Sequence, residues 1–250
     1  MAPLQTTTLS GKPLDLTELF SKGSFTGSNG VTLNYRYLLP KDYDESKKYP
    51  LIMMMHGAGE IETDNKKQLQ NFSEAFRDED SPIYGCIVIA PQCPTGKKWV
   101  SVPTWHNFTI DEFPETAEIQ TAVELFLDMQ KRYRVDTDRV YATGLSMGGF
   151  ATWDMAVRHP ELFVAIAPLC GGGDPTGAAE RLVNLPIWTF HGDADPTVPF
   201  SNTESLVNAL RAAGNTRVKF DVMNGYAHNI WHPVYARIEL IDWLLSHKRA

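Results

Sequence analysis

The spacing of hydrophobic and polar residues changes along the chain. Residues 30–40 alternate between polar and apolar side chains, which predicts an antiparallel edge strand with one face in water. Later apolar runs are short and uninterrupted, as expected of central parallel strands covered by helices on both faces. These runs comprise residues 51–55, 87–90, 140–143, 164–168 and 187–190, and a further strand-like run covers residues 218–223.

Apolar residues with helical spacing lie between these runs, and acidic residues tend to come early in them. The predicted helices cover residues 115–132, 150–157, 202–213 and 233–248. Alternating strands and helices predict an α/β fold, with a mostly parallel central sheet, an antiparallel N-terminal edge and helices on both faces. We expect a single domain over residues 24–250, preceded by an N-terminal extension over residues 1–23. Residues 170–186 are too few to form a separate cap domain.

Composition narrows the function classes. A chain of 250 residues with 43% hydrophobic residues can form one large core. Its net charge of −7 and the lack of a basic cluster interleaved with aromatic residues argue against a nucleic-acid partner. No apolar run approaches the roughly 20 residues that span a bilayer, and Met1 to Ser10 lack the pattern of a signal peptide. We expect a soluble protein without a membrane partner, either cytoplasmic or secreted with its signal peptide removed.

A glycine-flanked serine lies between a predicted strand and a predicted helix. The segment has the pattern G-x-S-x-G and consists of Gly144-Leu145-Ser146-Met147-Gly148-Gly149. A serine in that context occupies a tight turn, and small residues must flank it where its backbone approaches the neighbouring strand and helix. The hydroxyl then points out of the fold, so Ser146 is the candidate nucleophile.

A carboxylate and a histidine follow two later strands. Asp195 comes after the apolar run 187–190, and His228 comes after the run 218–223. Because reactive loops gather at the carboxyl ends of the strands in open α/β sheets, we expect these two residues to meet Ser146. His228 would remove the serine proton during attack on a carbonyl and return it to the leaving group, while Asp195 would orient the imidazole.

Two backbone donors are expected to bind the oxyanion that forms during such an attack. The N–H of Met147, directly after the serine, is one. The glycine-rich loop 56–60 follows the strand-like run 51–55 and is expected to supply the other. Ala58 is the preferred donor in this loop, and Gly57 is the alternative.

Other residues compete for the roles of acid and base. Asp193 is close to Asp195 in sequence, and Asp174 follows another apolar strand. His232 is an alternative base, although we expect His232-Pro233 to begin the final helix.

Four motifs resemble those of the α/β-hydrolase superfamily. They are the segments 56–60, 144–149, 191–199 and 225–228, and the order serine, acid, histidine is that of its catalytic triad. Two further segments, 90–94 and 170–175, are similar to the carboxylesterase branch often called predicted peptidases, which is related to polyhydroxybutyrate-depolymerase-like, feruloyl and acetylxylan esterases.

This resemblance favours Asp195 over Asp193 and Asp174, because the D-x-x-V-P pattern that Asp195 begins is similar to that of the family. It implies a serine carboxylesterase that acts through an acyl-serine intermediate. The implied substrates are short-chain or aromatic esters, either small molecules or hydroxycinnamoyl esters linked to polysaccharides. A serine peptidase or amidase with the same triad is the alternative, and a non-catalytic binding protein is a third hypothesis.

Candidates for substrate binding lie near these motifs. Trp231 follows His228 by three residues, and Trp105 lies in the stretch 91–114, which has neither helical nor strand periodicity. Gln92, in one of the esterase-like segments, is the third candidate.

Cysteine and histidine spacing indicates no cofactor. Cys86, Cys93 and Cys170 form no C-x-x-C pair, and a bridge between the last two is not favoured because two strands would separate them. No three histidines have the spacing of a metal site, so neither a metal nor another cofactor is expected. His56 and His191 are expected to close strands and to hydrogen-bond with the backbone.

Overall fold

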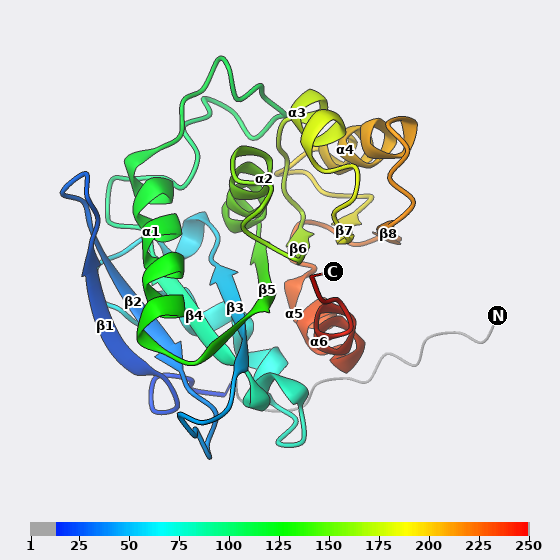
Figure 1. The fold of residues 1–250 in the computed structure, drawn as a ribbon. Helices are drawn as coiled ribbons and strands as arrows, with labels where there is room; N and C mark the ends of the chain where they lie inside the picture. The colour runs from blue at the N-terminus through cyan, green and yellow to red at the C-terminus, as the bar shows by residue number, and fades with distance from the viewer. Residues whose placement is uncertain (1–13, 250) are drawn as a thin grey trace.

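Residues 14–249 are described in the computed structural model, so residues 1–13 of the predicted N-terminal extension lie outside the described part. The chain forms an α/β fold around one eight-stranded sheet, in the order β1-β2-β4-β3-β5-β6-β7-β8 (Figure 1). Its strands are β1 (Ser21–Thr26), β2 (Thr32–Leu38), β3 (Tyr49–Met55), β4 (Ile87–Gln92), β5 (Val135–Leu145), β6 (Ala165–Leu169), β7 (Ile187–Gly192) and β8 (Val218–Met223).

The sheet is parallel from β4 to β8 and antiparallel at β1 and β2. Every residue of β4, β6 and β7 is buried, so each of these strands is covered on both faces. The prediction that the uninterrupted apolar runs form central parallel strands is therefore confirmed.

The N-terminal edge of the sheet differs from the prediction in one respect. The alternating segment 30–40 forms β2, which lies between β1 and β4 rather than at the edge. The edge strand is β1, where Phe25 is the only large apolar residue. The sequence of β1 therefore lacks the alternation of polar and apolar residues that predicts a strand. Leu16 and Phe20, within the segment assigned to the N-terminal extension, are buried in the core.

Along the chain, most of the helices follow parallel strands of the sheet. In Figure 1, α1 and α2 stand next to each other and pack against β5, and Thr116 caps α1 by accepting a hydrogen bond from the N–H of Ile119 at 3.1 Å. The helices are α1 (Ala117–Arg132), α2 (Met147–Arg158), α3 (Pro175–Arg181), α4 (Phe200–Ala212), α5 (Trp231–Tyr235) and α6 (Ile238–Leu245), with 3₁₀ segments η1 (Ala58–Glu60), η2 (Lys67–Phe76) and η3 (Pro82–Gly85). None of the helices in the described part is both long enough and apolar enough to cross a membrane.

The C-terminal helical region also differs from the prediction. The single helix expected over residues 233–248 is two helices, because Arg237 has an extended backbone (φ −84°, ψ 111°) between α5 and α6. His232-Pro233 was expected to begin the final helix, but α5 begins at Trp231 and Pro233 is its third residue. Helix α3 has no counterpart among the predicted helices, because seven residues show too little helical periodicity.

The order of the strands decides where the candidate residues lie. Strands β5 to β8 are parallel neighbours, so their carboxyl ends lie at the same side of the sheet. Ser146 directly follows β5, Asp195 follows β7, and His228 follows β8. The fold therefore brings three loops that are distant in sequence to one surface.

Candidate active site

Ser146 occupies a strained turn between β5 and α2. Its backbone has a positive φ (φ 54°, ψ −121°), a conformation that residues other than glycine rarely adopt. A methyl group on Gly144 would overlap the backbone of Gly148, and one on Gly148 would overlap the backbone carbonyl of Met55. These two glycines allow β5, α2 and β3 to approach closely enough to hold Ser146 in this conformation.

A chain of hydrogen bonds links Ser146, His228 and Asp195. The Ser146 hydroxyl donates to His228 Nε2 at 2.8 Å, and His228 Nδ1 donates to Asp195 Oδ2 at 2.6 Å. The structure thus brings together all three residues that the sequence singled out. The imidazole is placed to take the hydroxyl proton, and the carboxylate is placed to fix which ring nitrogen carries a proton.

Asp195 is held as an anion although its side chain is fully buried. Burial alone would raise its pKa, but hydrogen bonds from His191, His228 and the backbone N–H groups of Thr197 and Val198 hold the pKa well below its usual range. The two backbone groups donate to Oδ1 at 2.8 Å and 3.0 Å. An imidazolium formed at His228 would therefore face a fixed negative charge.

The alternative acids have other partners. Asp174 is the N-cap of α3, where its carboxylate accepts from the N–H groups of Gly177 at 2.9 Å and Ile110 at 3.0 Å. Asp193 is exposed, and its Oδ1 accepts from the N–H of Gly225 at 2.6 Å. Neither carboxylate is hydrogen-bonded to a histidine, which leaves Asp195 as the partner of His228.

The loop after β3 lies against Ser146. His56 is fully buried and fixes this loop, since its Nδ1–H donates to the carbonyl of Gly57 at 2.7 Å and its Nε2 accepts from the N–H of Cys93 at 2.9 Å. Both ring nitrogens therefore bond to the backbone, as predicted, and burial lowers the His56 pKa to about 4. A methyl group on Gly57 would lie 3.4 Å from Ser146 Cβ, so this glycine lies beside the nucleophile.

Met147 is the other expected donor. It is the first residue of α2, so its N–H is one of the N-terminal amides that no carbonyl within the helix can accept. The positive end of the α2 dipole lies at the same point. The N-terminus of α2 thus offers a free backbone N–H group directly after Ser146.

Glu60 is a buried carboxyl in this loop that the sequence did not single out. Its Oε1 accepts from the Asn71 side chain at 2.9 Å, and its Oε2 is buried. Burial raises the pKa of Glu60, with hydrogen bonds from Gly57 and Asn71 acting in the opposite direction. The loop after β3 therefore contains two buried polar side chains, His56 and Glu60, that are hydrogen-bonded within the protein.

The three candidates for substrate binding occupy different environments. The Trp231 ring lies edge-on to the His228 ring, with centroids 5.6 Å apart, and is partly exposed. Trp105 packs against Phe150 of α2 at 5.5 Å, also partly exposed. Gln92 is wrong as a candidate, because its side chain is buried and its amide is fully used within the protein. Its Oε1 accepts from the N–H of Asn65 at 2.7 Å, and its Nε2 donates to Asp64 at 2.8 Å.

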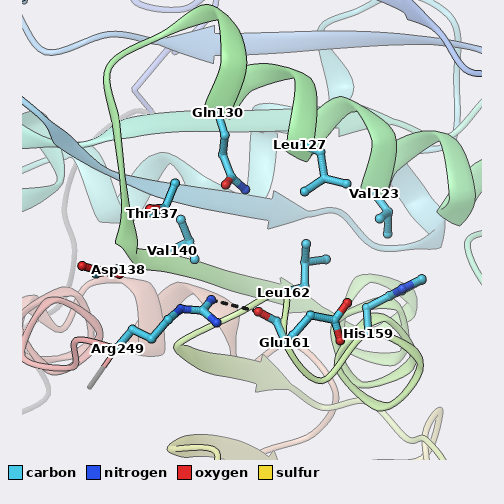
Figure 2. A pocket seen from close by; sticks show the side chains of 10 residues that line it. All are labelled: Val123, Leu127, Gln130, Thr137, Asp138, Val140, His159, Glu161, Leu162 and Arg249. Carbon is cyan, nitrogen blue, oxygen red and sulfur yellow. Dashed lines mark hydrogen bonds between the residues drawn. The ribbon is translucent and has the colours of Figure 1, made fainter.

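A separate cavity of about 350 Å³ lies away from this site. It adjoins the C-terminal end of α2 and the first half of β5, whereas Ser146 lies at the other end of both elements. Figure 2 shows Arg249 closing one side of it by donating to the Glu161 carbonyl at 2.8 Å. Its lining comprises Val123, Leu127, Gln130, Thr137, Asp138, Val140, His159, Glu161, Leu162 and Arg249.

Within residues 14–249, no three His, Cys, Asp or Glu side chains cluster as ligands for a metal ion. All three cysteines are buried and free, so the bridge between Cys93 and Cys170 is absent.

Comparisons with known proteins agree with this site and fold. Residues 43–239 match the family described as Phospholipase/Carboxylesterase, and the chain belongs to this family of α/β-hydrolases. A crystal structure of a thermostable esterase superposes with a TM-score of 0.85 at 34% identity, over 93% of this chain and 64% of that one.

Two curated relatives have different activities in their names. The bifunctional acetylxylan esterase/xylanase XynS20E of Neocallimastix patriciarum is 27% identical over 71% of this chain and 24% of its own length. The probable dipeptidyl-peptidase 5 of Aspergillus niger is 25% identical over 80% of this chain and 31% of its own length. The chain thus spans less than a third of the length of either relative.

Proposed function

We propose that this protein is a serine carboxylesterase with Ser146 as nucleophile, His228 as general base and Asp195 as the acid that orients it. The observation that carries the proposal is the unbroken hydrogen-bond chain from Ser146 through His228 to Asp195. Membership of a family of carboxylesterases and phospholipases supports it.

The reaction proceeds in two halves. Nε2 of His228 accepts the Ser146 proton as Oγ attacks the ester carbonyl, and the resulting imidazolium returns that proton to the leaving alkoxide. Water then enters, gives its proton to His228 and attacks the acyl-serine. The carboxylic acid leaves as Ser146 recovers its proton. Asp195 stabilises the imidazolium in both halves without taking up the proton.

The oxyanion of each tetrahedral intermediate needs donors next to Ser146. The N–H of Met147 and an amide from the loop after β3, with Ala58 preferred, fill this role in our proposal. The bonds that His56 makes to Gly57 and Cys93 hold this loop in place before substrate arrives.

The proposed substrates are short-chain or aromatic acyl esters, including those carried by plant polysaccharides. Trp231 next to His228 offers an aromatic wall for the acyl or alcohol group. Residues 170–186 contain only the seven-residue helix α3, so no folded cap covers the site from this segment. The name of the acetylxylan esterase relative points to the same class of ester.

A serine peptidase is the second candidate, because the same triad cleaves amides and a dipeptidyl-peptidase is among the relatives. The two activities differ in the leaving group that His228 must protonate.

The test is hydrolysis of p-nitrophenyl acetate, butyrate and dodecanoate, methyl ferulate, acetylated xylan and a peptide p-nitroanilide by the purified protein and by Ser146→Ala. Ser205→Ala, an exposed serine on α4, is the matched control. We expect turnover of the acetate, butyrate or ferulate esters that Ser146→Ala loses by roughly 10⁴-fold or more and Ser205→Ala retains. Cleavage of the anilide alone would replace the esterase by a peptidase, and full ester turnover by Ser146→Ala would contradict the proposal.

A further inference from the structure

Asp195 has a second histidine partner besides His228. His191 is the fifth residue of β7 and has no exposed side-chain surface. Its Nε2 lies 3.2 Å from Asp195 Oδ2 and 3.1 Å from the carbonyl oxygen of Val198. The predicted role of His191, bonding to the backbone after a strand, accounts for only the second of these contacts.

The partners of the ring decide where its proton lies. Both atoms that face Nε2, Asp195 Oδ2 and the Val198 carbonyl oxygen, are acceptors only, because the carboxylate is ionised. A bare Nε2 would face two negative oxygens in a buried site, so Nε2 must carry hydrogen. Nδ1 lies 2.7 Å from the hydroxyl of Thr203, which also lies 3.3 Å from the carbonyl oxygen of Gly171. The single hydroxyl hydrogen can point to Nδ1, the nearer acceptor, and thereby complete a neutral ring.

We propose that His191 is a positioning residue of the catalytic apparatus: its Nε2–H donates to Asp195 Oδ2, orients the carboxylate toward His228 and shares its negative charge. The inference rests on the proposed function, in which Asp195 serves His228. It assigns His191 a role through Asp195, and His191 does not touch the substrate.

Each carboxylate oxygen of Asp195 faces two nitrogen atoms. Oδ1 accepts from two backbone N–H groups of the turn, while Oδ2 lies 2.6 Å from His228 Nδ1 and 3.2 Å from His191 Nε2. The backbone bonds fix the position of the carboxylate, and the bond from His191 leaves only part of the Oδ2 charge for His228. Other titratable groups near Asp195 are the exposed Asp193, two residues earlier, and the buried thiol of Cys170, whose pKa is raised chiefly by its own burial.

His191→Phe removes the donor and keeps a ring of similar size, whereas His191→Gln keeps an N–H at the distance of Nε2. Without the donor, Oδ2 interacts more strongly with the His228 imidazolium, so the base is protonated at higher pH. We expect His191→Phe to move the acid limb of kcat/KM upward by about 0.5 to 1 pH unit. Its kcat should fall roughly tenfold with KM nearly unchanged.

His191→Gln is expected to restore most of kcat and the wild-type pH profile. Phe200→Leu is the packing control, because the Phe200 ring contacts His191 at 5.8 Å without bonding to Asp195. It should leave the pH profile in place. An unchanged acid limb in a folded His191→Phe, or an equal shift in Phe200→Leu, would overturn the inference.

A measurement on the unaltered protein keeps the inference testable if His191→Phe fails to fold. The ¹⁵N chemical shifts of labelled histidine show which ring nitrogen carries hydrogen, and His191→Gln identifies the His191 signals by their loss. We expect Nε2 of His191 to be protonated throughout pH 6 to 8, and a bare Nε2 in this range would refute the assignment. Because this readout needs no turnover, it separates failure of the inference from failure of the esterase proposal.

Discussion

Gly148 packs against Met55 so closely that any side chain on Gly148 would overlap the Met55 carbonyl group. Met55 ends β3 and Gly148 is the second residue of α2, so this contact sets how near the helix that follows the nucleophile comes to the sheet. The loop that carries Gly57 and Ala58 begins directly after Met55. The contact therefore also affects the distance between the two proposed oxyanion donors.

Gly148→Ala is expected to lower the free energy of unfolding by more than about 3 kcal/mol, because the added methyl group meets backbone atoms that cannot move aside. Gly59→Ala is the matched control in the neighbouring loop, where a methyl group would have no neighbour within 4 Å. It should change stability by less than about 1 kcal/mol. Urea denaturation of the three proteins measures both values, and equal stabilities would show that the contact is looser than described.

Asp195→Asn is expected to lower kcat by roughly 10⁴-fold, because an amide in place of the carboxylate no longer favours the His228 tautomer that accepts the serine proton. Asp193→Asn, two residues away, serves as the control, since Asp193 bonds to the N–H of Gly225 and not to a histidine. It should keep kcat within about threefold of wild type. Initial rates on the best ester found in the panel decide between the two carboxylates, and a large loss in Asp193→Asn would exchange their roles.

The sequence predicted the central strands and the triad because both leave strong local signals. Uninterrupted apolar runs mark strands buried on both faces, and the flanking glycines of Ser146 report the close approach that the structure shows. Asp195 and His228 were found because each follows a strand, and parallel neighbours bring such positions together. The position of each residue directly after a strand was therefore enough to predict that three residues distant in sequence lie close together.

Other features depend on contacts that no local pattern reports. β1 is mostly polar, and its place at the edge follows from pairing with β2. The break between α5 and α6 depends on the backbone of one residue, Arg237, inside an otherwise helical period. Gln92 looked available for substrate, but the side chains and backbone of the loop 60–65 occupy its amide. His191 was assigned only backbone bonds, although its spacing of four residues from Asp195 within one strand-loop unit is a usable signal.

Asp154 makes a testable contribution to the pH dependence of stability. It is buried in α2, and burial raises its pKa to about 6 even though Arg158 lies 2.8 Å away. The folded pKa exceeds the unfolded value of about 3.9, so the contribution to stability is complete below pH 4 and is lost as pH rises through 6. Relative to Asp154→Asn, the unfolding free energy of the wild type should fall by about 3 kcal/mol between pH 4 and pH 7.

Asp136→Asn provides a control of opposite sign for that titration. Burial opposes ionisation of Asp136, but Arg139 at 2.8 Å, the N–H of Asp138 and the charge of Lys248 lower its pKa overall. Its contribution to stability is therefore present above pH 4 and is lost as pH falls. Guanidinium denaturation at both pH values should show the two variants diverging from wild type in opposite directions. The same trend in both would assign the pH dependence to other groups.

Trp231 and Trp105 are the remaining candidates for the wall of the substrate site, and two alanine variants separate them. Trp231 lies against His228, whereas Trp105 packs against Phe150 with the Lys98 ammonium 5.4 Å from its ring centroid. We expect Trp231→Ala to raise KM for methyl ferulate about tenfold and to change KM for methyl butyrate much less, because methyl butyrate has no aromatic group that can stack on the indole. Trp105→Ala should alter both values by less than threefold if the ring only anchors its loop. If Trp231→Ala instead lowers kcat equally for both esters, the indole supports the His228 ring, and the specificity for aromatic esters must come from elsewhere in the loops.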